Sequence, residues 1–140
     1  MIRLVIDTSS IISALIKNGI SRKIIVNPVI QLVTPDHSLK EISKYKNLIC
    51  KKAKINANEF NIIFNLLFEK ITIIPKEEYE EFFDAAKTLI DDINDVPFIA
   101  LCLALKADGI WSDDTHFKPS KEITIYRTRE LALAFKPRKK

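Results

Sequence analysis

Carboxylates stand at the ends of two short, mostly apolar runs of this sequence and at the beginning of a third. One follows residues 2–6, two follow residues 110–112, and one precedes residues 96–105. These acids are Asp7, the pair Asp113-Asp114, and Asp95. In an open parallel sheet, ligands bind at the carboxyl ends of the strands, so the acids are expected to meet there. No cation in the sequence is placed to neutralise them, and buried carboxylates are costly unless they are paired or coordinate a metal. The pattern therefore predicts divalent-metal chemistry.

Each acid also has a purely structural interpretation. Asp7 suits an Asx turn that leads into a helix, and Asp95 is a favoured N-cap residue. Asp113 and Asp114 are typical loop residues ahead of Pro119. Taken singly, these interpretations are as good as catalysis. Taken together, acids at several strand ends and at the mouth of a central helix favour a site.

Glu41 is a fourth candidate. It lies in an expected helix, where it either pairs with Lys44 at i,i+3 on the surface or reaches into the site, and spacing leaves both open. His116 follows Asp114 by two residues and could touch the site. It is too isolated for a zinc site, which needs several N or S ligands, and the serines after Asp7 lack the glycine elbow of a Ser-His-Asp hydrolase. Oxygen ligands alone point to Mg²⁺ or Mn²⁺.

The composition narrows the class of protein. At 140 residues the chain is expected to form one domain, 1–135, with a basic tail at 136–140. Hydrophobic residues, at 47%, suffice for a core, and the presence of only two Gly excludes a glycine-rich phosphate loop. The longest apolar run, 96–105, is too short to span a bilayer, so no membrane role is expected. Cys50 and Cys102 form no C-x-x-C pair, and we expect a cytoplasmic protein without disulfides.

Charge is unevenly distributed around the net value of +4. Residues 40–54 hold six Lys and one acid, and residues 127–140 hold six basic residues and one acid. Residues 77–95 hold eight acids and one Lys. Basic faces that flank an acidic centre suit a polyanion held over a metal site. Each run alone is also typical of a solvated face.

Short apolar runs alternate with helical patterns along the chain. Strands are expected at 4–6, 30–33, 71–74, 110–111 and 122–126, and helices at 11–16, 21–26, 36–48, 57–67, 78–89, 96–105 and 129–135. This alternation predicts an α/β fold, a three-layer α/β/α arrangement with a central parallel sheet of four to five strands. The helix at 96–105 is apolar all round, so it is expected in the middle of the fold with Asp95 at its N-terminus.

Four segments, in this order, resemble the PIN-domain family. They are Val5-Ile6-Asp7-Thr8-Ser9, Leu39-Lys40-Glu41-Ile42, Asp95-Val96-Pro97-Phe98-Ile99-Ala100-Leu101, and Ala107-Asp108-Gly109-Ile110-Trp111-Ser112-Asp113-Asp114-Thr115-His116-Phe117. The resemblance extends over nearly the whole chain, to about residue 135. It implies a small α/β/α nuclease that cuts RNA with Mg²⁺ or Mn²⁺. In many relatives the domain is the toxin of a pair with a small antitoxin protein, and many form homodimers.

The resemblance also assigns roles to residues. The catalytic acids it implies are Asp7, Glu41, Asp95 and Asp114. The metal ligands among them would be Asp7, Asp95 and Asp114. Small polar or acidic side chains expected beside these acids are Ser9, Ser112, Asp113 and Asp92. The basic residues expected to hold RNA through its phosphates are Lys40, Lys44, Arg127 and Arg129.

The last motif contains two candidate acids. The family commonly has Thr-x-Asp or Thr-x-Asn there, whereas this chain has Ser112-Asp113-Asp114. In an extended chain, Ser112 and Asp114 would share one face and Asp113 would point away, which favours Asp114. Trp111 and Tyr126 are candidates for stacking on unpaired bases, although each is also typical of a core.

Two other functions fit parts of the pattern. A non-catalytic RNA-binding or scaffold module could keep the same fold, but the complete set of four acids favours an enzyme. A phosphatase or phospho-receiver on a similar sheet would need an acceptor Asp after a middle strand. The strand at 71–74 instead ends in Pro75-Lys76, which argues against that class.

Overall fold

Five parallel strands form the centre of this chain, whose structure is a computed structural model that describes residues 1–135. The strands are β1 (Ile2–Ile6), β2 (Ile30–Pro35), β3 (Ile71–Ile74), β4 (Gly109–Trp111) and β5 (Ile125–Tyr126). They lie in the order β3-β2-β1-β4-β5, and every neighbouring pair is parallel. The predicted central parallel sheet is confirmed. The predicted basic tail, 136–140, lies outside the described residues.

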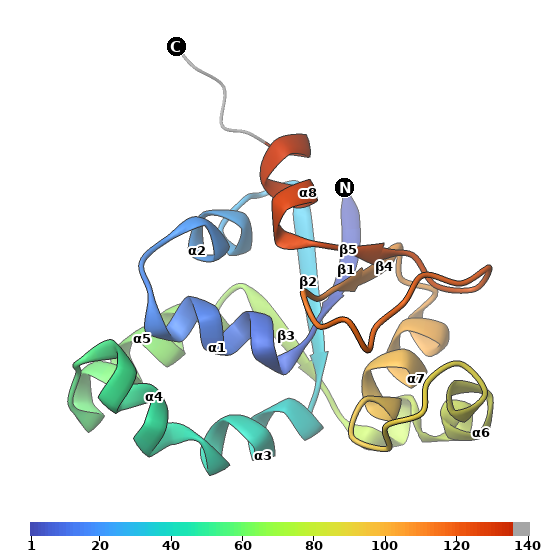
Figure 1. Cartoon of the computed structure of the whole chain (residues 1–140), viewed down its shortest axis with the longest axis horizontal. Coiled ribbons are helices and arrows are strands. Elements are labelled where there is room, and N and C mark those ends of the chain that lie inside the picture. The colour runs from blue at the N-terminus through green and yellow to red at the C-terminus, as the bar shows by residue number, and fades with distance from the viewer. Residues whose placement is uncertain (136–140) are drawn as a thin grey trace.

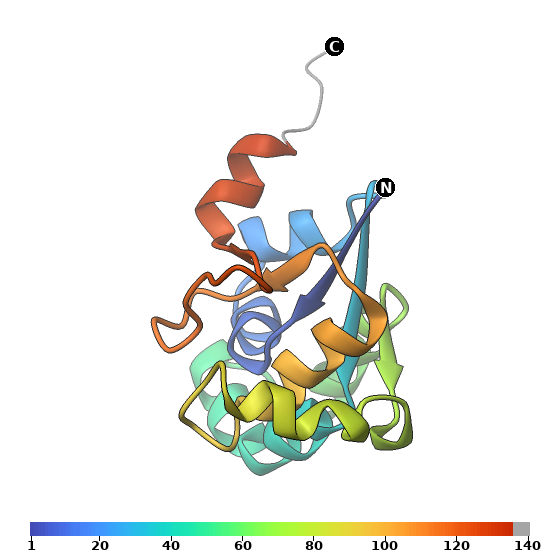
Figure 2. The same cartoon turned by 90° about the vertical axis from the view of Figure 1, so that its right-hand side faces the viewer.

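Helices cover both faces of the sheet and complete the predicted three-layer α/β/α arrangement (Figures 1 and 2). The helices of one layer are α1 (Thr8–Ile16), α2 (Ile20–Ile25), α3 (His37–Lys44), α4 (Lys46–Ala53), α5 (Ala57–Phe68) and α8 (Thr128–Ala134). The other layer contains the 3₁₀ turns η1 (Lys76–Glu78) and η2 (Glu80–Phe82), then α6 (Phe83–Lys87) and α7 (Val96–Leu105). Among the described residues, no helix is both long and apolar enough to cross a membrane.

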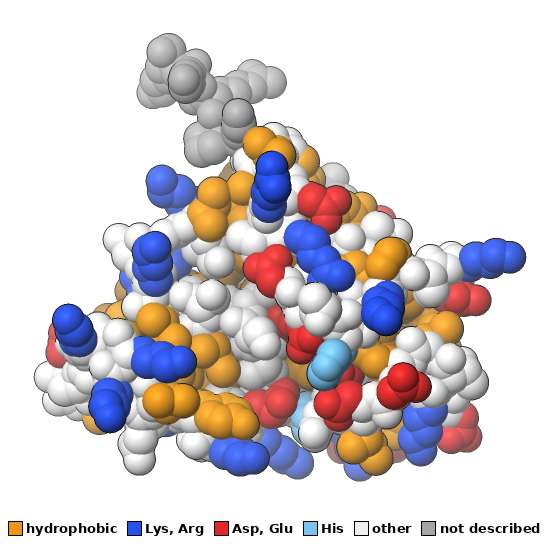
Figure 3. All heavy atoms as spheres, in the orientation of Figure 1, with side chains coloured by type: hydrophobic (Ala, Val, Ile, Leu, Met, Phe, Trp, Pro, Cys, Tyr) orange, Lys and Arg blue, Asp and Glu red, His pale blue; other side chains and the backbone are white. Residues whose placement is uncertain are grey.

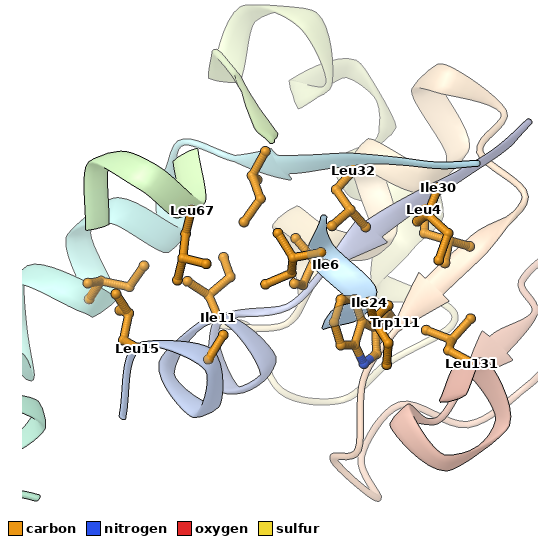
Figure 4. Close-up of a cluster of buried hydrophobic side chains, with 14 of the residues drawn as sticks. Leu4, Ile6, Ile11, Leu15, Ile24, Ile30, Leu32, Leu67, Trp111 and Leu131 are labelled. Carbon is orange, nitrogen blue, oxygen red and sulfur yellow. The ribbon is translucent and has the colours of Figure 1, made fainter. Parts of the chain in front are cut away.

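The alternation of side chains along β1 divides the core into two clusters. Leu4 and Ile6 face the layer of α1, whereas Val5 faces the layer of α7. Figure 4 shows part of the first cluster, with Ile11 and Leu15 of α1 toward one end and Trp111, Ile24 and Leu131 toward the other. Trp111 is fully buried, so of its two predicted roles the core position is confirmed and stacking on unpaired bases does not apply.

Helix α7 crosses the second face of the sheet and contacts β1, β2 and β4. Seven of its residues, from Val96 to Cys102, are buried, which confirms the prediction of a central apolar helix. The chain reaches α7 from the carboxyl end of β3, so the N-terminus of α7 lies at the carboxyl edge of the sheet. Asp95 immediately precedes it.

Two predicted helices are wrong in detail. The helix predicted at 36–48 is interrupted at Tyr45, whose N–H donates to the carbonyls of both Glu41 and Ile42. The bend lets α4 turn from the sheet edge and pack on α1, which buries Ile49. Pro35, which precedes the predicted helix, is the last residue of β2.

The helix predicted at 78–89 forms two 3₁₀ turns and only a short α-helix, α6. A continuous α-helix over 78–89 would stack Glu80 on Asp84 at i,i+4, which is unfavourable for like charges. In the structure Tyr79 is buried and its hydroxyl donates to Asp36, which fixes the turn instead. The last strand is also shorter than the predicted 122–126, because its partner β4 offers only three residues for pairing.

Gly109 is the position where the fold depends most directly on a missing side chain. A Cβ there would lie 2.5 Å from the Thr124 carbonyl oxygen and 2.7 Å from the Tyr126 ring. Gly109→Ala should therefore separate β4 from β5 and cost about 1–3 kcal/mol of stability. Gly19→Ala is the matched control, since its nearest neighbours are Lys17 side-chain atoms at 3.7 Å. Thermal unfolding of both variants measures the effect, and equal melting temperatures would contradict it.

Candidate active site

Four separate segments of the chain bring acidic side chains into one cleft of about 210 Å³ at the carboxyl edge of the sheet. The segments are the end of β1, helix α3, the N-terminus of α7 and the loop after β4. The side chains that line the cleft include all four acids singled out from the sequence, Asp7, Glu41, Asp95 and Asp114, together with Thr8, Ser9, Asp92, Asn94, Phe98, His116 and Phe117. Figure 3 shows acidic side chains gathered near the centre of this face, around a histidine.

Asp7 is the most buried of these acids, at 3% exposed. One carboxylate oxygen accepts from the backbone N–H of Ser10 at 2.8 Å and caps α1, and the other accepts from the hydroxyl of Ser112. Ile6 pairs with Trp111, so Asp7 and Ser112, the next residues after β1 and β4, lie side by side. Burial raises the pKa of Asp7, while the bonds from Ser112 and Ser10 oppose the shift.

Glu41 turns toward the cleft, so the open question about its direction is answered by its contacts. The hydroxyl of Thr8 donates to its carboxylate at 2.6 Å, and the imidazole of His37 lies 3.7 Å away. Thr8 was not among the site residues predicted from the sequence. Its position directly after Asp7, on the first turn of α1, is the signal that could have marked it as a partner for an acid in the cleft.

Asp95 carries the least satisfied carboxylate. Its Oδ2 is buried and has no hydrogen-bond partner among the described residues, and its side chain does not cap α7. Burial, followed by the charges of Asp92 and Asp114, raises the pKa of Asp95 to about 6, and His116 partly opposes the shift. A carboxylate that leaves the helix N-terminus uncapped is not what the capping interpretation of Asp95 predicts.

The two acids after Ser112 point in different directions. Asp114 lines the cleft, and its backbone N–H donates to the Ser112 hydroxyl at 3.0 Å. Asp113 accepts at its two oxygens from the backbone N–H and the hydroxyl of Thr128, at 2.8 and 2.6 Å. Asp113 therefore fixes the start of α8. The imidazole of His116 lies 3.7 Å from both Asp114 and Asp95.

The basic residues expected to hold RNA differ in their surroundings. The guanidinium of Arg127 donates to the carbonyls of Ser112, Asp114 and Phe117, at 2.9, 2.8 and 2.8 Å, so it braces the loop that carries Asp114. Lys40 lies next to the cleft, one residue before Glu41. The ammonium of Lys44 sits 5.5 Å from the centre of the Tyr45 ring, and Arg129 is exposed on α8.

This set of side chains fits a divalent cation. Within residues 1–135, no Lys or Arg forms an ion pair with any acid of the cleft, and the basic side chains within 4 Å of these acids are the imidazoles of His37 and His116. Single ligand atoms of Asp92, Asp95 and His116 lie within 4.8 Å of one another, and the Oδ2 of Asp95 has no other partner. Carboxylate oxygens are the ligands that Mg²⁺ and Mn²⁺ prefer.

Comparisons with known proteins agree with this geometry. The sequence model of one protein family, described as PIN domain, matches residues 5–135. A solved structure of VapBC2 from Rickettsia felis, bound to a DNA fragment from its promoter, contains a chain with a TM-score of 0.65 and 16% identity. The similarity covers 91% of this chain and 98% of that one. A sequence comparison with curated proteins gave no match. The chain belongs to the PIN-domain family.

Proposed function

We propose that this chain is an endoribonuclease that depends on Mg²⁺ or Mn²⁺. The observation that carries the proposal is the convergence of Asp7, Glu41, Asp95 and Asp114 in one cleft without a neutralising cation. Such a group is unstable as a set of bare charges and is suited to hold divalent cations against a phosphodiester. RNA is the substrate that the family membership favours.

The roles of the residues follow from their contacts. Asp7, Asp95 and Asp114 would hold the metal, which when bound supplies positive charge to the scissile phosphate and acidifies water. Ser112 keeps the carboxylate of Asp7 turned toward the cleft, and Thr8 does the same for Glu41. Positioning of this kind fixes the charges before substrate arrives, which is the main contribution a protein makes to phosphoryl-transfer chemistry.

A toxin role is part of the proposal. The similar solved structure is a VapBC2 complex on its promoter DNA, and we carry the toxin–antitoxin context over to this chain. A small antitoxin protein would then be its partner, encoded by a neighbouring open reading frame. A homodimer and a cytoplasmic location are consistent with this role and stay predictions.

A non-catalytic RNA-binding or scaffold module is the second candidate. It would need the fold and its basic faces but not the acids. The Oδ2 of Asp95, which is buried without a hydrogen bond, argues against this module. Burying that carboxylate is unfavourable, and a protein that only binds a polyanion does not need it. A cleft of negative charges beneath the phosphate backbone of RNA would weaken RNA binding unless a cation occupied the cleft.

Asp95→Asn should abolish most of the metal-dependent cleavage of single-stranded RNA while the fold remains intact. The substitution keeps the shape of the side chain and removes a ligand charge. The measurement is the cleavage rate with Mg²⁺, with Mn²⁺ and with EDTA, beside circular dichroism of the variant. Wild-type cleavage by Asp95→Asn, or cleavage that survives EDTA, would contradict the proposal.

The neighbours Asp113 and Asp114 should separate activity from stability. Under saturating Mn²⁺, Asp114→Asn should lower the cleavage rate at least tenfold, about 1.4 kcal/mol of barrier. Asp113→Asn should affect the rate much less, because this side chain bonds to Thr128 outside the cleft. It should instead lower the melting temperature by loosening α8. The reverse order of rates would assign the ligand to Asp113 and leave the nuclease proposal standing.

The raised pKa of Asp95, about 6 against an ordinary 3.8, predicts how stability depends on pH. The folded state binds more protons than the unfolded state between these values, so the free energy of unfolding of the metal-free protein should fall as pH rises through them. Asp7 adds to the trend in the same direction. Because protons compete with the cation, Mn²⁺ should stabilise the protein more at about pH 7.5 than at about pH 5.

Thermal melts at the two pH values, with and without Mn²⁺, measure this dependence. In Asp95→Asn the fall in metal-free stability should be smaller, and so should the gain from Mn²⁺. A wild-type protein that Mn²⁺ stabilises equally at both pH values would show that these carboxylates are not the ligands.

A further inference from the structure

A second cavity, of about 270 Å³, borders the acidic cleft and is lined by three lysines. We call it the lysine cavity. Its lysines come from three separate elements: Lys40 from α3, Lys76 from η1 and Lys87 from α6. Lys87 is the single basic residue of the acidic segment 77–95. The fold therefore assembles a positive site that no one stretch of sequence contains.

The lysine cavity and the acidic cleft are lined by neighbouring residues of the same two segments, although no residue lines both. Lys40 and Glu41 are consecutive residues, and they line the cavity and the cleft respectively. On the other side, Asp95 lines the cleft while Val96 and Pro97, which follow it, line the cavity. A chain held over the acids therefore needs to extend only a short way to reach the lysines.

The positive charge of the lysine cavity is available to a ligand. Within residues 1–135, none of the three ammonium groups forms an ion pair with a carboxylate. The one acid that lines the cavity is Asp36, and its oxygens already accept from the hydroxyl of Tyr79 and the backbone N–H of Lys76. His37 also lines the cavity, and its Nε2 lies 3.7 Å from a carboxylate oxygen of Glu41.

Another cavity beside the cleft has the opposite character. It has a volume of about 510 Å³ and is lined by Asp91 and Asp92, with Lys118 and His116. Its carboxylates would repel a phosphate. Of these two cavities, the lysine cavity therefore offers the more favourable electrostatic path for a polyanion that leaves the cleft.

We propose that the lysine cavity binds a backbone phosphate of the RNA strand next to the phosphate that is cut. The inference rests on the proposed nuclease function. It adds that the RNA strand runs from the cleft to the lysine cavity. Ammonium groups bind phosphates as point charges and read no sequence, so the cavity sets position rather than base preference. It also predicts that a substrate too short to reach the cavity is bound weakly.

Affinity for RNA tests the inference without any need for cleavage. Binding of a labelled single-stranded RNA oligonucleotide is measured in EDTA for the double variant Lys76→Gln/Lys87→Gln. We expect a loss on the order of tenfold, since charge-assisted bonds to phosphate are lost. The slope of log affinity against log salt should fall by about 0.7 for each phosphate contact removed. Lys87→Arg, which keeps the charge, should bind nearly as well as wild type.

The control variant is Lys70→Gln. Lys70 is exposed and directly precedes β3, so it lies at the amino edge of the sheet, opposite the cleft. The Lys70→Gln substitution removes a positive charge that lies outside the lysine cavity. It should leave the affinity for RNA within about twofold of wild type. Equal losses in the control and the double variant would mean that only net charge matters and would overturn the inference.

A strand with one neutral linkage locates the contact. A methylphosphonate is placed at one backbone position at a time, and the position that weakens wild-type binding should have no further effect on the double variant. Losses that simply add at every position would overturn the inference. Unchanged RNA affinity of the double variant would also overturn it and assign the lysines to another anion, such as an acidic segment of a protein partner. Absence of RNA cleavage by the wild type would contradict the nuclease proposal and leave this binding result valid.

Discussion

The parallel pairing of β1 with β2 on one side and β4 on the other is the constraint on which the site depends. It places the carboxyl ends of three strands at one edge, so the residues after Ile6, Pro35 and Trp111 emerge together. Alternation along β1 then sends Asp7 to the same face as Val5, which is the face covered by α7. The helix brings Asp95 to that edge by its N-terminus. Secondary structure alone thus gathers acids that are far apart in the sequence.

Gathering negative charges at one edge of the sheet is unfavourable. The acids of the cleft differ in how many hydrogen bonds they accept. Asp7 receives two donors, one from Ser10 and one from Ser112, whereas Asp95 has an oxygen with no partner and a raised pKa. A cleft built only for stability would have paired both acids, because an unpaired buried carboxylate costs more than it contributes. The imbalance is what a site for a cation requires: one ligand held rigidly, and another left free to coordinate.

The sequence was sufficient for the order and type of most elements, because apolar periodicity reports burial directly. Strand β3 and helix α7 have the predicted bounds for this reason. It failed where a tertiary contact overrides a local pattern, as in the turns η1 and η2, which depend on the bond from Tyr79 to Asp36. Strand order, and with it the neighbours of each acid, is equally non-local. The sequence did not predict the hydrogen bonds from Thr8 and Arg127, because the residues that accept them lie in other segments.

The loop after β4 illustrates how charged residues divide between chemistry and support. Arg127 was expected to bind a phosphate, yet its guanidinium is used on three carbonyls of this loop. Asp113 likewise serves Thr128 rather than the cleft. Each of these contacts fixes the backbone beside Asp114. The proposed recognition of an RNA strand therefore relies on side chains without such duties. Of these, Lys40 begins the basic run 40–54, whereas Lys76 and Lys87 lie outside both basic runs.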